Sequence, residues 1–129
     1  MSWKKEISQI KLREKLAKQQ GGPEAVKLQH NKGRLTLRER IDLLLDKESF
    51  EEIGKVAGGA EYDDEGNLTS LTPANFILGF GKIDGRDVIV GGEDFTVKGG
   101  SPNAAGLRKS VYTEAVSYTH LTLPTNGLV

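Results

Sequence analysis

The sequence predicts an α/β protein, and three local patterns support this prediction. The first is a pair of strands at residues 75–83 and 86–90, joined by Asp84-Gly85, a dipeptide typical of two-residue hairpin turns. The second is that both strands carry apolar residues at successive positions, so both faces of their sheet are expected to be covered. The third is an amphipathic helix upstream, at residues 37–45. Helices layered on a sheet define the α/β class.

Two further helices are predicted before that one. Residues 2–20 have helical periodicity, with Ser2 as the expected N-cap, and Gly21-Gly22 ends the helix. Pro23 suits the first position of a short helix that ends at His30, because its missing N–H would have no partner there. Trp3, Ile7 and Ile10 lie at helical spacing, and Trp3 is expected to be a packing residue.

The helix at residues 37–45 has the clearest start signal. Thr36 and Glu39 are spaced as a capping box, in which each side chain bonds the backbone N–H of the other residue. One apolar stripe is expected to face the core: Leu37, Ile41, Leu44 and Leu45.

The remaining segments carry weaker signals. Residues 50–56 are predicted as a short strand, and residues 58–72, rich in glycine and acidic residues, as a mobile surface loop. Residues 91–100 are expected to continue extended. A helix is predicted at residues 102–115, with its N-terminus on Gly99-Gly100-Ser101.

Composition and charge narrow the function classes. Hydrophobic residues make up 36% and charged residues 28% of the 129 residues, as in ordinary globular domains, and 18 basic residues balance 18 acidic ones. No dominant basic field therefore favours nucleic acid or an anionic membrane. Cysteine is absent, which excludes disulfides and thiolate metal sites and is compatible with the cytoplasm. No apolar run is long enough to span a bilayer, so we expect a soluble, cytoplasmic protein.

The glycine pair Gly99-Gly100 with Ser101 is the candidate ligand-binding segment. Backbone N–H groups at the start of a helix attract phosphates or an enolate oxygen, although strand-to-helix turns also use glycine for steric reasons. Basic residues nearby could add charge to an anion site, but they are expected to be solvated: Lys98, Arg108 and Lys109.

No catalytic or metal-binding residue is assigned. Glu93 and Asp94 are expected to cap a turn or pair with lysine rather than act as a general base. His30 has no partner at ligand spacing and is expected at the surface.

Three phrases, in this order, give the sequence a family resemblance. They are HNKGRLTLRERIDLL at residues 30–44, GKIDGR at residues 81–86 and DFTVKGGS at residues 94–101. Together they resemble the carboxyltransferase (beta) subunit of biotin-dependent acyl-CoA carboxylases of the propionyl-CoA or methylcrotonyl-CoA type. The resemblance covers about residues 28–101, and the run after Ser101 is only loosely similar.

The resemblance implies a crotonase-like fold of repeated ββα units. It also implies an enzyme that transfers a carboxyl group from carboxybiotin, on a separate carrier protein or domain, to the α-carbon of a short acyl-CoA. Gly99, Gly100 and Ser101 would then lie on the acyl-CoA side. Implied partners are a biotin carboxylase, a biotin carrier subunit and further copies of the chain, with neither nucleic acid nor membrane. The family's oxyanion-binding glycines lie downstream of these phrases.

Residues 116–129 are predicted to be a non-native tail. Residues 116–125 can be encoded by GTC TCT TAT ACA CAT CTG ACG CTG CCG ACG, the reverse complement of a transposase sequencing adapter. On this interpretation, residues 1–115 are the truncated N-terminal part of a carboxyltransferase domain and are inactive alone. The tail is then expected to be extended, with no apolar side chain in the core.

Two other functions are compatible with parts of the sequence. A biotin-dependent acyl-CoA decarboxylase runs the same transfer backwards, and nothing in the sequence separates it from a carboxylase. A non-enzymatic adaptor could use the basic helix at residues 2–20 to bind RNA or an acidic partner. Salt-sensitive retention of RNA would favour the adaptor, whereas retention of acyl-CoA by the intact subunit would favour the enzyme.

Overall fold

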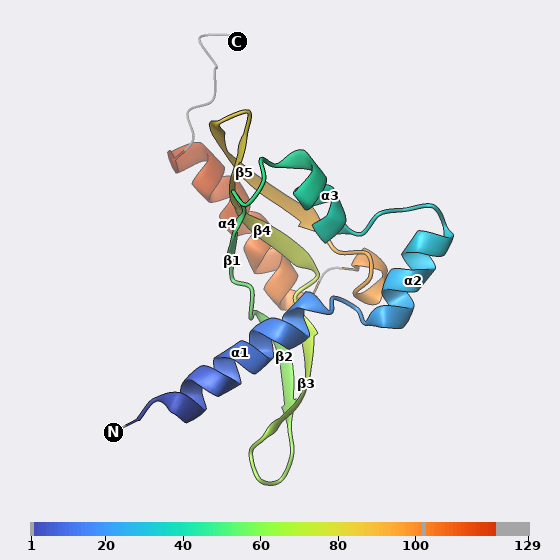
Figure 1. Cartoon of the computed structure of the whole chain (residues 1–129), viewed down its shortest axis with the longest axis vertical. Helices are drawn as coiled ribbons and strands as arrows, with labels where there is room; N and C mark the ends of the chain where they lie inside the picture. Colours follow the sequence, from blue (N-terminus) through green and yellow to red (C-terminus); the bar gives the residue numbers. More distant parts are fainter. Residues whose placement is uncertain (1, 102, 121–129) are drawn as a thin grey trace.

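The computed structural model describes residues 2–101 and 103–120 of the chain. Figure 1 shows their helices and strands, which follow one another in this order: α1 (Lys4–Lys18), α2 (Pro23–Asn31), α3 (Leu37–Leu44), β1 (Glu51–Ile53), β2 (Gly58–Tyr62), β3 (Leu68–Pro73), β4 (Phe76–Ile83), β5 (Arg86–Glu93), the short 3₁₀ helix η1 (Lys98–Gly100) and α4 (Ala104–His120).

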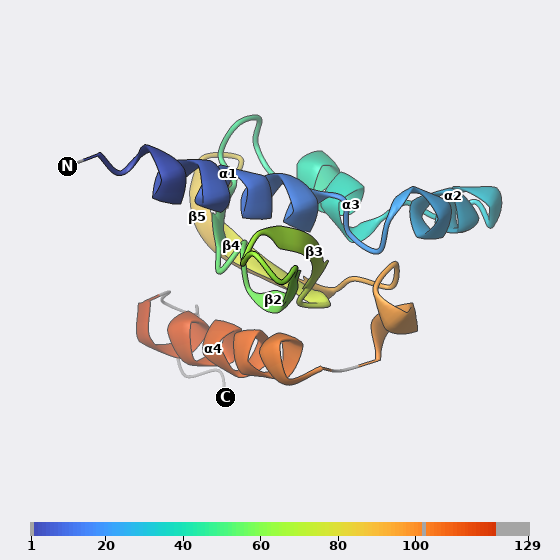
Figure 2. The ribbon, with the colours of Figure 1, turned by 90° about the horizontal axis from the view of Figure 1, so that it is seen from below.

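The strands form two antiparallel sheets. One has the order β1-β4-β5, and the other is the hairpin of β2 with β3. Figure 2 shows α1 and α3 on one side of the strands and α4 on the other. Helices on both faces agree with the predicted α/β layering. Within the described residues, no helix is long and apolar enough to cross a membrane.

The core lies between α3 and the three-stranded sheet. Ile41 and Leu45 pack against Ile77, and all three side chains are buried. Burying an aliphatic side chain of this size stabilises a fold by about 1.5–3 kcal/mol, so this contact holds α3 on the sheet. Half-buried residues surround the cluster: Leu37, Phe50, Ile83, Val88 and Val90.

The start of α3 is formed as predicted, but its apolar stripe is shorter. The Thr36 side chain accepts from the Glu39 amide, and the Glu39 carboxylate accepts from the Thr36 amide at 2.7 Å. The expectation that Leu44 packs in the core is wrong, because its side chain is 54% exposed. The helix ends at Leu44, and extended backbone at Leu45 directs that residue to the sheet instead.

The hairpin at Asp84-Gly85 is confirmed. Strands β4 and β5 pair antiparallel from Phe76–Glu93 to Ile83–Arg86. Both turn residues have positive φ, 50° at Asp84 and 79° at Gly85, as a type I′ turn requires. The Asp46 carboxylate accepts hydrogen bonds from both turn amides, at 2.9 and 2.8 Å.

The prediction of a mobile loop at residues 58–72 is wrong. The segment forms the β2–β3 hairpin, and Asp63 organises its turn by accepting from the amides of Glu65 and Asn67 at 3.0 and 2.8 Å. Helix α1 packs against β3, which supplies a surface that composition could not reveal. The predicted strand at residues 50–56 is limited to β1, because positive φ at Gly54 ends it.

Helix α1 forms, but its predicted packing is wrong at its N-terminal end. The N-cap is Trp3 without a side-chain cap, and Ser2 does not occupy that position. Ala17, near the C-terminal end, is buried, whereas Trp3, a predicted packing residue, is 64% exposed. Ile7 and Ile10 on the same face are 49% and 52% exposed. Figure 1 shows the reason, since the N-terminal half of α1 extends away from the three-stranded sheet.

The segment after β5 also differs from the prediction. The chain leaves the extended conformation at Asp94 and makes the turn η1 before α4. Helix α4 begins at Ala104, where the Asn103 side chain accepts from the Gly106 amide at 2.7 Å, so it does not start on the glycine pair.

The expectation of an extended tail is wrong for its first residues. Residues 116–120 continue α4, and Val116 is buried. The helix continues past residue 115, and Val116 falls on its apolar face. Leu121 and Leu123 lie outside the described residues, and the origin of residues 116–129 stays a prediction.

Candidate functional site

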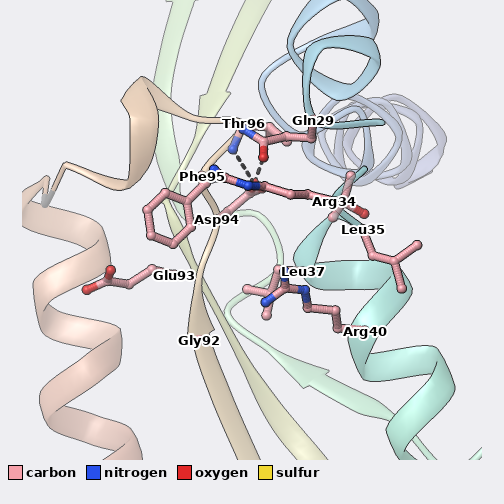
Figure 3. Close-up of a pocket in the computed structure, with 11 residues that line it drawn as sticks. Gln29, Arg34, Leu35, Leu37, Arg40, Gly92, Glu93, Asp94, Phe95 and Thr96 are labelled. Atoms are coloured by element: carbon pink, nitrogen blue, oxygen red, sulfur yellow. Dashed lines mark hydrogen bonds between the residues drawn. The ribbon is translucent and has the colours of Figure 1, made fainter. Parts of the chain in front are cut away.

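An open pocket of about 460 Å³ lies between the start of α3 and the end of β5. The connection from α2 to α3 forms one wall, and the turn at Asp94 forms the other, as Figure 3 shows. Its lining residues are Gln29, Arg34, Leu35, Thr36, Leu37, Arg40, Gly92, Glu93, Asp94, Phe95 and Thr96.

The capping box of α3 positions the first wall. Thr36 is 3% exposed and is fixed by its reciprocal hydrogen bonds with Glu39. The Thr36 backbone N–H, together with the imidazole of His30 at 2.8 Å, lowers the pKa of the Glu39 carboxyl below its ordinary value. This arrangement fixes the backbone from which Arg34 and Arg40 reach the pocket.

The two arginines make the first wall cationic. Arg34 and Arg40 are exposed, and within the described residues no salt bridge involves either side chain. In Figure 3, Arg40 extends from α3 toward β5. Their side chains therefore remain available to an anionic group that enters the pocket.

The opposite wall is a turn held by a buried carboxylate. Asp94 is 2% exposed, and its Oδ1 accepts from the Thr96 amide at 2.9 Å and from the Thr96 hydroxyl at 2.6 Å. The prediction that this acid caps a turn is confirmed. These two bonds to Oδ1 hold the wall in shape.

Phe95 connects the pocket to the glycine pair. Its ring is 56% exposed, and a Cβ placed on Gly100 would lie 2.9 Å from it. Gly99 and Gly100 both have positive φ, 63° and 81°. The amide of Gly100 donates to the Val97 carbonyl oxygen at 3.0 Å, and the amide of Ser101 donates to the Lys98 carbonyl oxygen at 3.1 Å. These two donors are therefore committed to the turn.

The other predicted site residues are separated from this pocket. His30 lies at the surface, as predicted, and contacts Glu39. Lys98 and Arg108 are exposed, as predicted. The prediction that Lys109 is solvated is wrong, because its ammonium donates to the Gly54 carbonyl at 3.2 Å and its burial lowers its pKa. Among the described residues, no group of three or more His, Cys, Asp or Glu could hold a metal ion.

Lys109 lies beside a second polar group on the molecule. Arg38 and Glu52 form a two-pronged ion pair, 2.8 Å for each hydrogen bond, which joins α3 to β1. Glu52 favours the charged form of Lys109, whereas Arg38 opposes it. This group links α3, β1 and α4 and lies on residues that do not line the pocket.

The pocket has the composition of a binding site, and the exposed carboxylate of Glu93 also lines it. It offers two arginines, the apolar side chains of Leu35, Leu37 and Phe95, and a rigid turn. Arg34 and Arg40 were missed as site residues in the sequence, although both lie inside the first family phrase. Their role depends on β5 returning to the start of α3, which no local pattern reports.

Comparison with known proteins places this geometry in context. The carboxyl transferase domain family matches residues 28–127. The propionyl-CoA carboxylase beta chain of Roseobacter denitrificans is 39% identical over 105 residues, which are 80% of this chain and 20% of that protein. Methylmalonyl-CoA decarboxylase subunit alpha of Veillonella parvula is 39% identical over 92 residues, 70% of this chain and 18% of that protein. The chain thus spans about a fifth of the length of these curated relatives.

A solved structure gives the same result for the fold. The 12S transcarboxylase hexamer, with methylmalonyl-coenzyme A and methylmalonic acid bound, matches with a TM-score of 0.75 and 30% identity. The match covers 92% of this chain and 23% of that one. The predicted crotonase-like carboxyltransferase fold is therefore confirmed for the part that the chain spans.

Proposed function

This chain belongs to the carboxyl transferase domain family, and on that premise we propose that it forms the acyl-CoA side of a carboxyltransferase. The proposed reaction moves a carboxyl group from carboxybiotin to the α-carbon of a short acyl-CoA. One observation carries the proposal: two of the three family phrases, residues 30–44 and 94–101, supply opposite walls of the same pocket.

The chemistry of the walls fits an acyl-CoA. Its phosphates are anionic, and guanidinium groups such as those of Arg34 and Arg40 bind phosphate oxygens through paired, charge-assisted hydrogen bonds. Its apolar parts can pack on Leu35, Leu37 and Phe95. The ligand would therefore lie across the pocket, with its charged groups toward α3.

Gly99, Gly100 and Ser101 are proposed as ligand-contacting residues beside this pocket. Nothing lies within 4 Å of a Cβ built on Gly99, so a ligand can approach the backbone there closely. The amides of Gly100 and Ser101 already donate within the turn. The segment would thus provide a close surface for the ligand, and it would not use these two amides to stabilise an enolate.

Carboxyl transfer also requires groups outside this pocket. Deprotonation of the α-carbon is costly unless donors stabilise the oxyanion as it forms. Carboxybiotin on a carrier protein would supply the carboxyl group, and a biotin carboxylase would reload the carrier. We propose these two partners, assembly with further copies of the chain and a cytoplasmic location as parts of the same function. We expect the 129-residue chain alone to transfer no carboxyl group.

A decarboxylase is the second candidate. Methylmalonyl-CoA decarboxylase subunit alpha of Veillonella parvula is as similar in percentage identity as the propionyl-CoA carboxylase chain, which makes the reverse transfer an equal alternative. Both candidates bind an acyl-CoA and a biotin carrier. The direction of transfer, measured with carboxylated and uncarboxylated carrier, separates them.

Binding of acyl-CoA to the 129-residue chain tests the proposal. Titration of the isotope-labelled chain with propionyl-CoA should shift the backbone amide signals of Gly99, Gly100, Ser101 and the pocket residues. Arg40→Ala should weaken binding by about tenfold or more, since charge-assisted bonds to phosphate are lost. Arg86→Ala, an exposed arginine at the start of β5, is the matched control. Signals that shift elsewhere, or an equal effect of both variants, would exclude this pocket.

A further inference from the structure

One buried residue, Asn75, holds both ends of the segment that follows β5. Its backbone carbonyl accepts a hydrogen bond from the Asp94 amide at 2.7 Å, and its side-chain amide donates to the Ser101 carbonyl. Asp94 and Ser101 are the first and last residues of the third family phrase, residues 94–101. Asn75 is 2% exposed and directly precedes β4, so this closure is anchored to the three-stranded sheet.

Helix α4 keeps the Asn75 side chain in place. A Cβ added at Gly106 would collide with the Oδ1 atom of Asn75, so the helix can lie this close only because position 106 is glycine. The Asn103 side chain accepts from the Gly106 amide at 2.7 Å and so caps the helix at this point. Since α4 also packs against β4, Asn75 is enclosed between the sheet and the helix.

A second buried polar residue holds the segment from within. The Thr96 hydroxyl accepts from the Gly21 amide at 2.9 Å and donates to the Asp94 Oδ1 at 2.6 Å, and Figure 3 shows Thr96 beside Asp94. Thr96 and Val97 are 7% and 2% exposed, so both side chains point into the protein. The hydroxyl therefore ties the segment to the connection between α1 and α2. These hydrogen bonds join residues inside the chain and do not depend on what covers its outer surface.

The backbone of the segment is strained near its end. Lys98, Gly99 and Gly100 have φ values of 49°, 63° and 81°, all in the left-handed region. Glycine adopts this region freely, whereas lysine does so at a cost in free energy that the surrounding structure must offset. The fixed ends and the strained lysine both indicate that residues 94–101 are held in one conformation before a ligand arrives.

We propose that Asn75 and Thr96 are positioning residues that hold residues 94–101 preformed for acyl-CoA. This inference rests on the proposed function, in which Phe95 lines the pocket and Gly99 contacts the ligand. Asn75 lies outside the pocket lining and acts only through this segment. A preformed segment has lost its conformational freedom before binding, so that loss does not reduce the affinity for the ligand.

The first measurement needs no ligand. NMR relaxation of the free chain gives an order parameter for each backbone amide, about 0.85 where the backbone is rigid and below about 0.6 where it is flexible. Residues 95–99 should be rigid in the parent chain. Asn75→Ala and, separately, Thr96→Val should make them flexible, because each removes a fixed attachment of the segment. The amides of β4 and β5 should stay rigid in both variants.

Two further variants separate positioning from stability. Thr96→Ser keeps the hydroxyl and should keep the segment rigid, whereas Thr96→Val keeps the side-chain shape and removes the hydroxyl. Ile41→Val removes a methyl group from the core and lowers stability without touching the segment, so the order parameters of residues 95–99 should not change. All variants are compared at a temperature at which their unfolding curves show them folded. If Asn75→Ala does not fold, the Thr96 pair still decides.

Titration with propionyl-CoA then connects order with affinity. Asn75→Ala and Thr96→Val should each raise the dissociation constant by about tenfold or more, and Thr96→Ser should bind more tightly than Thr96→Val. Ile41→Val should bind like the parent chain. A residue with only a structural role would act as Ile41→Val does, because it would lower the melting temperature and leave the affinity of the folded chain unchanged.

Three results would overturn the proposal. They are flexible residues 95–99 in the free parent chain, unchanged order in both Asn75→Ala and Thr96→Val, or a flexible segment that binds propionyl-CoA as tightly as the parent does. A parent chain that does not bind propionyl-CoA would be a different failure. It would refute the proposed function and the acyl-CoA role of the segment, while the order parameters would still show whether Asn75 and Thr96 hold it.

Discussion

The backbone amide of Gly21 donates a 2.9 Å hydrogen bond to the hydroxyl of Thr96, 75 positions later in the chain. The same hydroxyl donates to the buried carboxylate of Asp94. The connection between α1 and α2 is thereby fastened to the turn that forms one wall of the pocket. A side chain at position 21 would collide with this turn, because its Cβ would lie 1.7 Å from the Thr96 carbonyl oxygen.

Gly21→Ala should therefore destabilise the chain by about 1–3 kcal/mol, the usual cost of forcing atoms into a packed site. Chemical denaturation measures the change in the free energy of unfolding. Gly59→Ala is the matched control, since nothing lies within 4 Å of its added Cβ, and it should change that free energy by about 0.5 kcal/mol or less. Equal stability of both variants would contradict the close contact.

Gly85→Val should destabilise the chain by about 1 kcal/mol or more, because a β-branched residue is strained at the φ of 79° that the turn requires. Thermal unfolding provides the measurement. Arg86→Val changes the next residue, where the strand is extended and valine is well tolerated, and should have a smaller effect. A melting temperature for Gly85→Val equal to that of the parent chain would contradict the positive φ of Gly85 in this turn.

Acid should weaken the capping box of α3. The pKa of Glu39 is lowered in the folded chain, first by the Thr36 backbone N–H and then by His30, relative to 4.5 in the unfolded chain. The stability that this carboxylate contributes is therefore complete above pH 4.5 and is lost as the pH falls through the folded pKa. Glu39→Gln should be less stable at pH 7 and lose less stability on acidification. Parallel pH profiles for the two chains would refute this role.

Lys109 and Lys82 should have opposite effects at alkaline pH. Burial lowers the pKa of Lys109 in the folded chain below the 10.5 of the unfolded chain. Between these two pKa values the unfolded chain binds more protons than the folded chain, so the free energy of unfolding rises with pH. Asp87, at 2.6 Å, raises the pKa of Lys82, so its contribution is complete below 10.5 and is lost as the pH rises through the folded pKa.

Methionine substitutions can separate these two contributions. The free energy of unfolding is compared with that of the parent chain between pH 8 and about 11. Lys109→Met should remove the part of this free energy that increases with pH, and Lys82→Met should remove the part that decreases. Lys109→Met should be at least as stable as the parent at pH 7, because it removes a charge that burial disfavours. A large destabilisation would show that the bond to the Gly54 carbonyl outweighs the desolvation.

Features with a local cause could be predicted from the sequence. The capping box needs only Thr36 and Glu39, and the hairpin turn needs only Asp84 and Gly85, so the sequence alone predicts both. The three family phrases were equally readable, and they identified the fold that the solved carboxyltransferase shares. In each case, the decisive residues are neighbours in the chain.

Features with a distant cause were missed. The β2–β3 hairpin depends on Asp63 to shape its turn and on α1 to cover β3, and neither is visible in a segment rich in glycine and acids. Helical spacing places Trp3 and Ile7 on one face of α1. It cannot indicate that both side chains stay exposed, because that depends on which other elements lie beside this half of the helix. The pocket likewise exists only because β5 returns to the start of α3.

The hydrogen bonds from the β4–β5 turn to the Asp46 carboxylate make the turn amides sensitive to the docking of α3. An isolated hairpin closes in about 1–10 μs, whereas the bonds from Asp46 to the turn amides span 38 and 39 positions and require a much larger loop to close. The amides of Asp84 and Gly85 should therefore gain protection from hydrogen exchange only when α3 docks. Their exchange rates would time the completion of this core rather than the first closure of the hairpin.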